Sequence, residues 1–255
     1  MLLVVSPAKT LDFETPAPKG LRLTRPAFAA EAAGLATALK RFDASGLGQL
    51  MDISPTLAAL NVERFRDFSA RPVAARERPA VLAFRGDTYL GMRAETFDAA
   101  DMDFAQQHLR ILSGLYGLLR PLDRIQPYRL EMGSALANAR GPDLYAFWGE
   151  RIARTLARQA RSLGTGTLVN LASQEYFRAV DTAALGLRVV TPQFKERRGG
   201  ALKIVSFSAK RARGAMAAFA IRHRLAEPES LQGFDEDGYR FEPSLSGPDE
   251  WVFAR

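Results

Sequence analysis

The first nine residues of the chain read MLLVVSPAK (residues 1–9) and predict how the fold begins. Leu2–Val5 is a short, continuous apolar run, which is typical of a buried β-strand. Ser6 and Pro7 end this strand, because proline has no backbone N–H to donate to a sheet. Polar residues that follow a buried strand often lie in a cleft at its carboxyl end, and we expect this of Ser6 and Lys9.

Outward from this strand, apolar runs and their boundaries predict the remaining elements. Strands are expected at Ala80–Phe84, Arg110–Leu112, Thr167–Ala172, Leu187–Val190 and Leu202–Phe207. Helices are expected at Ala27–Phe42, Gly46–Met51, Pro55–Phe68, Asp103–Leu109, Leu144–Leu163 and Ala209–Leu225. The elements interleave without the regular βαβ order of a doubly wound fold. We therefore expect one α/β domain of mixed α+β type over residues 1–255, built around a mixed sheet, with residues 45–68 as a helical appendage.

The charge of the chain favours a polyanionic partner. It has 255 residues with 35 Lys+Arg and 28 Asp+Glu, a net charge of +7, and a pI near 10.0. Residues 188–224 contain ten Lys or Arg and one acid, whereas residues 225–255 contain two Arg and eight acids. Such a basic region is typical of nucleic-acid binding, although a merely arginine-rich protein has the same composition.

Several classes of site are disfavoured by the composition. With no cysteine, the chain has no disulfides, thiolate chemistry or cysteine-ligated metal clusters. Its two histidines, His108 and His223, lie on apolar helix flanks and are better explained as packing residues. Phosphate-binding motifs of the Walker A and GxGxxG types are also missing, so we expect no cofactor and no metal. A signal peptide and a membrane span are not recognisable, so we expect a soluble, cytoplasmic protein.

A helical hairpin is expected around Asp52, Ile53 and Ser54. Ser54 has the character of an N-cap and Pro55 that of a first helical residue. The pattern resembles a helix-hairpin-helix DNA-binding motif, in which N–H groups at the second helix N-terminus bind a phosphate. The usual hairpin glycines are replaced here, and the charge of Asp52 would face the phosphate. A helical hairpin within an ordinary globular protein is the alternative.

Residues 113–133 alternate glycines, aromatics and charges of both signs, as irregular segments that line clefts often do. Arg120 and Arg129 would offer bidentate donors to a phosphate, and Tyr116 or Tyr128 would stack on a base. Alternatively, the segment is a buried turn with the ion pairs Arg120–Asp123 and Arg129–Glu131. A basic helix face is expected further along the chain. In the helix predicted at Ala209–Leu225, Lys210 and Arg213 lie on the side opposite the apolar face.

Four blocks of sequence together resemble the YaaA family of bacterial peroxide-stress proteins, and the resemblance extends from Met1 to about Phe253. They are Ser6–Leu11, the long block Phe104–Gly133, Asn170–Phe177 and Ser206–Gly214. The resemblance implies resistance to hydrogen peroxide, lowered free intracellular iron and less oxidative DNA damage. It also implies an α/β fold with a positively charged cleft and a helix-hairpin-helix element. The molecular activity implied is binding of duplex or structured DNA with little sequence preference.

Carried over to this sequence, the resemblance assigns the hairpin to Asp52, Ile53 and Ser54. From motif position and charge we add a set of cleft cations: Lys9, Arg120, Arg129, Lys195, Lys210 and Arg213. The sequence thus predicts a DNA-binding protein whose contacts are made to the phosphate backbone. It leaves the oligomeric state open.

The alternative is an enzyme that acts on nucleotides or DNA ends in a cleft built around residues 113–133. This alternative is suggested by a concentration of polar side chains that is greater than binding of a DNA backbone requires. The pocket residues would be Ser6, Tyr116, Tyr128, Glu131, Asn170, Ser173 and Glu175. A closed pocket shared by Glu131, Glu175 and Lys9 would favour a small substrate, whereas a wide groove would favour DNA.

Overall fold

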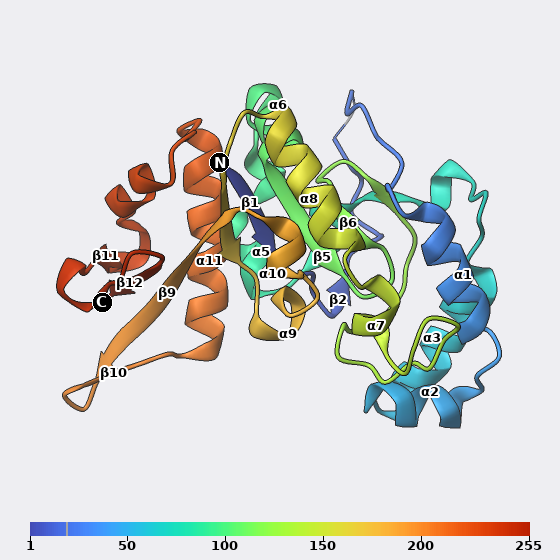
Figure 1. Ribbon diagram of the computed structural model, residues 1–255. Helices are drawn as coiled ribbons and strands as arrows, with labels where there is room; N and C mark the ends of the chain where they lie inside the picture. Colours follow the sequence, from blue (N-terminus) through green and yellow to red (C-terminus); the bar gives the residue numbers. More distant parts are fainter. Residues whose placement is uncertain (19) are drawn as a thin grey trace.

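The strand expected at the start of the chain lies at the centre of the molecule. A computed structural model describes residues 1–18 and 20–255 (Figure 1). Strand β1 (Leu2–Val5) is completely buried. It pairs in parallel with β5 (Leu109–Ser113) on one side and with β8 (Thr167–Leu171) on the other. Because both faces of such a strand are covered, an unbroken apolar run is the pattern it requires.

These strands belong to an eight-stranded sheet of order β11-β12-β9-β8-β1-β5-β6, in which β10 pairs with β9. Strands β9 (Arg188–Arg198) and β12 (Glu250–Ala254) extend the parallel part. The sheet is mixed because β6 (Gly117–Leu119), β10 (Ala201–Lys203) and β11 (Arg240–Phe241) are antiparallel to their neighbours. The mixed α/β class expected from the sequence is confirmed.

The order of the parallel strands reverses at β1. The chain goes from β1 to β5 on one side, and later crosses to β8 on the other. In α/β sheets, a ligand-binding crevice forms outside the carboxyl ends of the strands at such a reversal. The sheet therefore has a doubly wound centre that the sequence did not reveal, because residues 6–108 separate β1 from β5.

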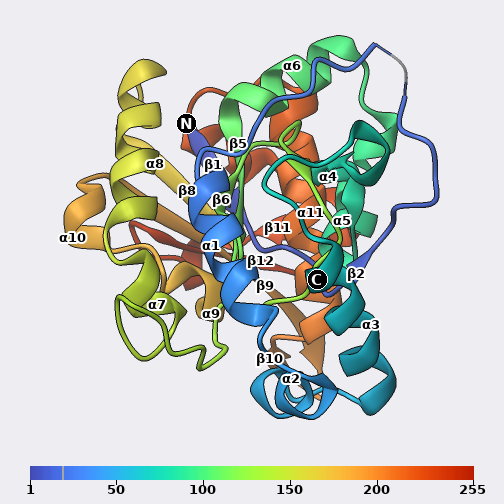
Figure 2. The same ribbon diagram turned by 90° about the vertical axis from the view of Figure 1, so that its right-hand side faces the viewer.

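Helices cover both faces of the sheet. Figure 2 shows α7 (Leu144–Trp148), α8 (Arg151–Ser162) and α10 (Thr182–Leu185) on one face, and α5 (Asp87–Met92), α6 (Ala99–His108) and α11 (Ser206–Arg222) on the other. Helices α1 (Ala29–Leu39), α2 (Ala44–Met51) and α3 (Pro55–Asp67) lie together at one side (Figure 1). None of the described helices combines the length and apolar character that crossing a membrane requires.

The remaining elements are short. They are β2 (Thr10–Leu11) with β4 (Phe84–Arg85), β3 (Arg78–Pro79) with β7 (Arg124–Ile125), and helices α4 (Ala80–Ala83) and α9 (Gln174–Phe177). Single 3₁₀ turns occur at Ala74–Arg76, Ala94–Thr96, Pro228–Gly233, Glu236–Gly238 and Pro243–Leu245.

Several predicted elements are wrong in type or extent; the strand expected at Leu187–Val190, for example, continues to Arg198. Ala80–Phe84 is mostly the short helix α4, because a short apolar run fits a buried helix as well as a strand. The predicted strand Leu202–Phe207 stops at Lys203, and α11 begins at Ser206. The helix predicted over Leu144–Leu163 is interrupted at Gly149, whose positive φ of 46° separates α7 from α8.

Helices α5 and α11 pack unusually closely, and two glycines make this possible. A methyl group added at Gly214 of α11 would overlap the carbonyl oxygen of Thr88, and one added at Gly91 of α5 would overlap that of Arg211. The two helices thus touch backbone to backbone. This contact sets the position of the first turns of α11 relative to the ends of β1 and β8.

The α5–α11 contact predicts the outcome of two alanine substitutions. Gly214→Ala should lower the free energy of unfolding by about 2–3 kcal/mol, because the helices must move apart to admit the methyl group. Gly34→Ala is the matched control, since Gly34 lies in α1 with no atom near an added methyl group. That change should raise the free energy of unfolding by up to about 1 kcal/mol. Urea denaturation measures both, and equal stabilities would contradict the packing described.

Candidate functional site

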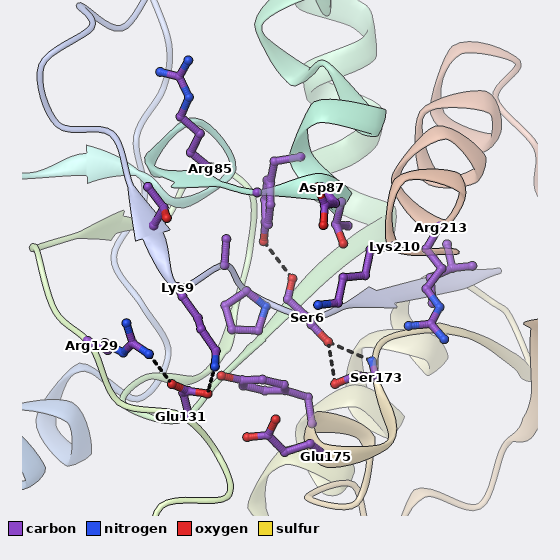
Figure 3. A pocket seen from close by; sticks show the side chains of 18 of the residues that line it. Ser6, Lys9, Arg85, Asp87, Arg129, Glu131, Ser173, Glu175, Lys210 and Arg213 are labelled. Carbon is purple, nitrogen blue, oxygen red and sulfur yellow. Dashed lines mark hydrogen bonds and ion pairs between the residues drawn. The ribbon is translucent and has the colours of Figure 1, made fainter. Parts of the chain in front are cut away.

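A pocket of about 390 Å³ opens at the carboxyl ends of β1 and β8, where the strand order reverses (Figure 3). Its wall is contributed by the segments after these strands, by the start of α5, by residues 128–131 and by α11. It therefore gathers residues from five distant parts of the chain. It is the crevice that the sheet topology predicts.

Two serines form the base of the pocket. The Ser6 hydroxyl, just after β1, accepts a hydrogen bond from the Ser173 backbone N–H at 2.8 Å, and the two hydroxyl oxygens lie 3.3 Å apart. The Tyr89 hydroxyl of α5 donates to the Ser6 carbonyl oxygen at 3.0 Å. The ends of β1 and β8 are thus tied to each other and to α5, so the pocket base is rigid.

On one side of the pocket, Glu131 joins two cations. Its carboxylate lies 2.8 Å from the Lys9 ammonium and 2.9 Å from the Arg129 guanidinium. The nearby Glu175 carboxylate accepts the Gly133 backbone N–H at 3.0 Å. Within the described chain the buried Nε of Arg129 lacks a hydrogen-bond acceptor. Glu131, Glu175 and Lys9 therefore share one pocket, and this pocket is open to solvent, since the Lys9 side chain is 65% exposed.

On the other side, Lys210 and Arg213 project from α11 toward the serines (Figure 3). For residues 1–18 and 20–255, no carboxylate forms an ion pair with either side chain. Burial lowers the pKa of the half-buried Arg213. A partly desolvated guanidinium without a counter-ion is unfavourable, so this side of the pocket is suited to an anion.

Three tyrosines complete the wall. Tyr89, Tyr128 and Tyr176 line the pocket, and burial raises the pKa of each phenol. The Tyr128 hydroxyl lies 2.6 Å from the Ser113 hydroxyl oxygen. At neutral pH these groups are uncharged, so they contribute aromatic surface and hydrogen bonds without adding negative charge.

Most of the residues singled out from the sequence converge here: Ser6, Lys9, Tyr128, Arg129, Glu131, Ser173, Glu175, Lys210 and Arg213. Two do not line it. Tyr116 is buried behind the wall, where its hydroxyl accepts the Gln126 backbone N–H at 3.1 Å. Asn170 is buried in β8, and its side-chain oxygen accepts the Ala172 N–H at 3.0 Å. The expectation that Tyr116 and Asn170 line the pocket is therefore wrong; both are buried residues outside its lining.

Two predicted cleft cations lie elsewhere. The Arg120 guanidinium is 3.3 Å from the Asp123 carboxylate, as the buried-turn alternative requires. The second ion pair of that alternative, Arg129–Glu131, also forms, but at the pocket wall. Lys195 lines a separate, shallow hollow beside Asp249 and Glu250. Arg120 directly follows β6 and Lys195 lies in β9. Neither strand is one of the two, β1 and β8, whose carboxyl ends form the pocket.

Other cations near the pocket were missed by sequence reasoning. Arg85, in β4, lines the pocket and also an adjoining one together with Arg64 of α3. Burial and the charge of Arg129 lower the pKa of Arg64. Thr10, Asp87 and Thr88 are further polar lining residues that were not predicted. The signal that was available is the position of Arg85 directly after the apolar run Ala80–Phe84.

Carboxylates form ion pairs with many of the cations in the basic segment 188–224. Half of its ten cations form ion pairs, four of them with residues that follow or interrupt the segment: Arg188 with Glu229 and Asp249, Arg197 with Glu242, Arg198 with Glu196, and Arg211 with Asp237. The fifth, Arg224, pairs with Asp101. The other five, Lys210 and Arg213 at the pocket among them, have no ion pair with a carboxylate of the described chain.

The predicted hairpin has a well-defined geometry. Asp52 adopts a left-handed conformation (φ 50°), and Ser54 caps α3 by accepting the Leu57 N–H at 3.4 Å. Pro55 occupies the first turn of α3. The phosphate-binding role of Asp52, Ile53 and Ser54 stays a prediction. Over the described residues, no group of three or more His, Asp or Glu side chains is arranged to hold a metal ion.

Comparison with known proteins identifies relatives over the full length of the chain. Residues 1–245 match the family model described as "Peroxide stress protein YaaA". A UPF0246 protein of Ruegeria pomeroyi is 54% identical over 255 residues, covering 100% of this chain and 98% of the relative. A UPF0246 protein of a Jannaschia species is 55% identical, with 100% and 97% covered. One from Verminephrobacter eiseniae is 52% identical, with 100% and 98% covered.

The pairing of the basic segment has a consequence for acid stability. A hydrogen bond from the Ser208 hydroxyl and the guanidinium of Arg255, 2.7 Å away, lower the pKa of Glu196 to about 2. Because the folded-state pKa lies below the ordinary value of 4.5, the stabilisation is complete above about pH 4.5 and is lost as the pH falls toward 2.

We expect Glu196→Gln to reduce the loss of thermal stability between about pH 4.5 and pH 2. Melting temperatures measured across this range test it. Glu63→Gln, at an exposed position on α3, is the control and should leave the pH dependence unchanged. Identical pH profiles for wild type and Glu196→Gln would contradict the assignment.

Proposed function

The chain belongs to the peroxide stress protein YaaA family, and on this premise we propose that it protects DNA from hydrogen peroxide by binding it. In this proposal the protein binds duplex or structured DNA through the phosphate backbone, with little sequence preference. Lowered free intracellular iron would accompany the same response. A role in peroxide stress follows from the family's description; DNA as the partner is our proposal.

One observation carries the proposal: cations from separate segments gather around one opening. Lys9, Arg85, Arg129, Lys210 and Arg213 line the pocket, and Arg64 lines the adjoining hollow. Clustered lysine and arginine bind a phosphate backbone because neutralised phosphates release their counter-ions. Such contacts position the protein but do not read sequence, which fits binding without strong sequence preference.

The hairpin between α2 and α3 supports a second contact. Arg64 lies in α3, the helix that Ser54 caps, so the hairpin and one of the cations near the pocket share one helix. DNA that follows this helix would meet the hairpin and the pocket mouth in turn. The charge of Asp52 opposes a phosphate at the hairpin, so we assign most of the affinity to the cations.

A second candidate is an enzyme that acts on nucleotides or DNA ends. The observation that favours it is the sharing of one pocket by Glu131, Glu175 and Lys9. Binding a phosphate backbone requires no carboxylates, whereas acid–base chemistry on a small substrate uses them. Both candidates place a phosphate-bearing ligand at the same opening.

DNA binding predicts a strong dependence on salt. The logarithm of the affinity for a duplex should fall linearly with the logarithm of salt concentration, by about 0.9 per phosphate neutralised. Lys210→Glu with Arg213→Glu should weaken binding to all sequences alike and make the slope shallower. Fluorescence anisotropy with several unrelated duplexes measures both effects.

The control for net charge is Arg154→Glu with Arg158→Glu on α8, which lies on the opposite face of the sheet from α11 (Figure 2). This variant changes the charge equally and should leave most of the affinity intact. An affinity that does not respond to salt, or that falls equally in both double variants, would argue against binding at the pocket side.

The enzymatic candidate predicts turnover that depends on Glu131. Wild-type protein incubated with nucleotides or phosphorylated DNA ends should yield a product separable by chromatography, and Glu131→Gln should slow its formation by at least about 100-fold. Glu63→Gln should retain full activity. Should the wild-type protein give no product from any of these substrates, the candidate would be rejected.

A further inference from the structure

The pocket has two sides of different charge balance. On the side of Lys9 and Arg129, Glu131 neutralises part of the positive charge through close ion pairs. On the side of α11, Lys210 and Arg213 face the serines without a carboxylate partner within the described part of the chain. Of the five cations that line the pocket, Lys9 and Arg129 pair with Glu131 and Arg85 pairs with Asp12, so the two without an ion pair in the described chain are those on α11.

Hydroxyl groups lie between the two unpaired cations and the strand ends. The Ser6 oxygen is engaged by the Ser173 N–H, which fixes both residues. The Ser6 hydroxyl donates to the Ser173 hydroxyl oxygen, 3.3 Å away, so the proton of the Ser173 hydroxyl is available to a ligand. Two hydroxyls and two cations then surround one position at the end of β1 and β8 (Figure 3).

We propose that this side of the pocket is a binding site for the dianionic phosphate of a phosphate monoester. The two unpaired cations match the two negative charges of a monoester, whereas a phosphodiester of the DNA backbone has one. Arg213 would bind two phosphate oxygens with its planar guanidinium, and Lys210 would act as a point charge. The proposal deepens the proposed function and rests on it, because it names the ligand group that the same site selects.

The volume and walls of the pocket set the size of the ligand. A cavity of about 390 Å³ falls in the range of pockets for whole small molecules and exceeds what a single phosphate fills. Tyr89, Tyr128 and Tyr176, whose phenols are uncharged, also line this cavity. The ligand is therefore a phosphate monoester attached to an organic group, either a free nucleotide or the phosphorylated end of a DNA strand.

The affinities of four ligands, measured directly or by competition, distinguish a free nucleotide from the phosphorylated end of a DNA strand. The ligands are a duplex capped by loops at both ends, a short single strand with a 5′-phosphate, the same strand with a 5′-hydroxyl, and a free nucleoside 5′-monophosphate. The 5′-phosphorylated strand should bind at least about tenfold more tightly than the 5′-hydroxyl strand. Competition by the mononucleotide would identify the free nucleotide as sufficient; competition by the phosphorylated strand with none by the mononucleotide would identify the DNA end.

Variants test whether the preference arises at this site. Arg213→Gln should abolish the preference for the 5′-phosphate, so that the phosphorylated and hydroxyl strands bind with the same, weakened affinity. Arg211→Gln is the matched control, because Arg211 lies on the same helix, is exposed and pairs with Asp237. It should keep the preference, and melting temperatures show whether each variant is folded.

Two outcomes would overturn the inference. One is equal affinity of the wild-type protein for the phosphorylated and hydroxyl strands, a comparison that needs no variant. The other is a 5′-phosphate preference that survives in a folded Arg213→Gln protein. Binding of the capped duplex separates this failure from that of the proposed function, because that duplex has no phosphate monoester. If the capped duplex binds without any end preference, DNA binding stands and the monoester site is rejected.

Discussion

The backbone contact between α5 and α11 is the constraint on which the pocket depends. Gly214 lies against the carbonyl oxygen of Thr88, and Thr88 itself lines the pocket. Arg213 directly precedes Gly214, so the distance between the helices determines how far its guanidinium reaches over the strand ends. A side chain at either glycine would separate α11 from the serines. The position of the cations is therefore a property of helix packing, held by a contact more than 120 residues apart in sequence.

The acidic residues of the segment 225–255 form ion pairs with the basic segment that precedes them. Their carboxylates pair with cations of β9 and α11 that would otherwise repel each other, such as Arg188, Arg197 and Arg211. Exposed pairs of this kind contribute little to stability individually. Their larger effect is to neutralise cations of β9 and α11 that lie away from the pocket, whereas Lys210 and Arg213 at the pocket stay unpaired within the described chain.

The sequence predicted the elements whose signals are local. The buried strand at Leu2–Val5 and the capped hairpin between α2 and α3 were recognisable, because apolar runs and capping residues act over a few positions. Site residues that directly follow strands, such as Ser6 and Ser173, could be predicted for the same reason. The predictions that failed concern residues whose structure depends on partners distant in sequence. Ala80–Phe84 became a helix through its tertiary surroundings, and Arg64 and Arg85 reach the site through chain packing that no short motif encodes.

The carboxylates of the pocket distinguish a selective site from a simple basic cleft. Glu131 and Glu175 lower the affinity for any anion nearby, so their presence is a cost for a protein that needs only to attract a phosphate backbone. That cost is offset if they fix the cations in place, as Glu131 does for Lys9 and Arg129. They also repel a second negative group on that side, so an anion is directed toward Lys210 and Arg213. A pocket with a neutralised side and a cationic side binds a ligand in one orientation, which is what recognition of a single phosphate group requires.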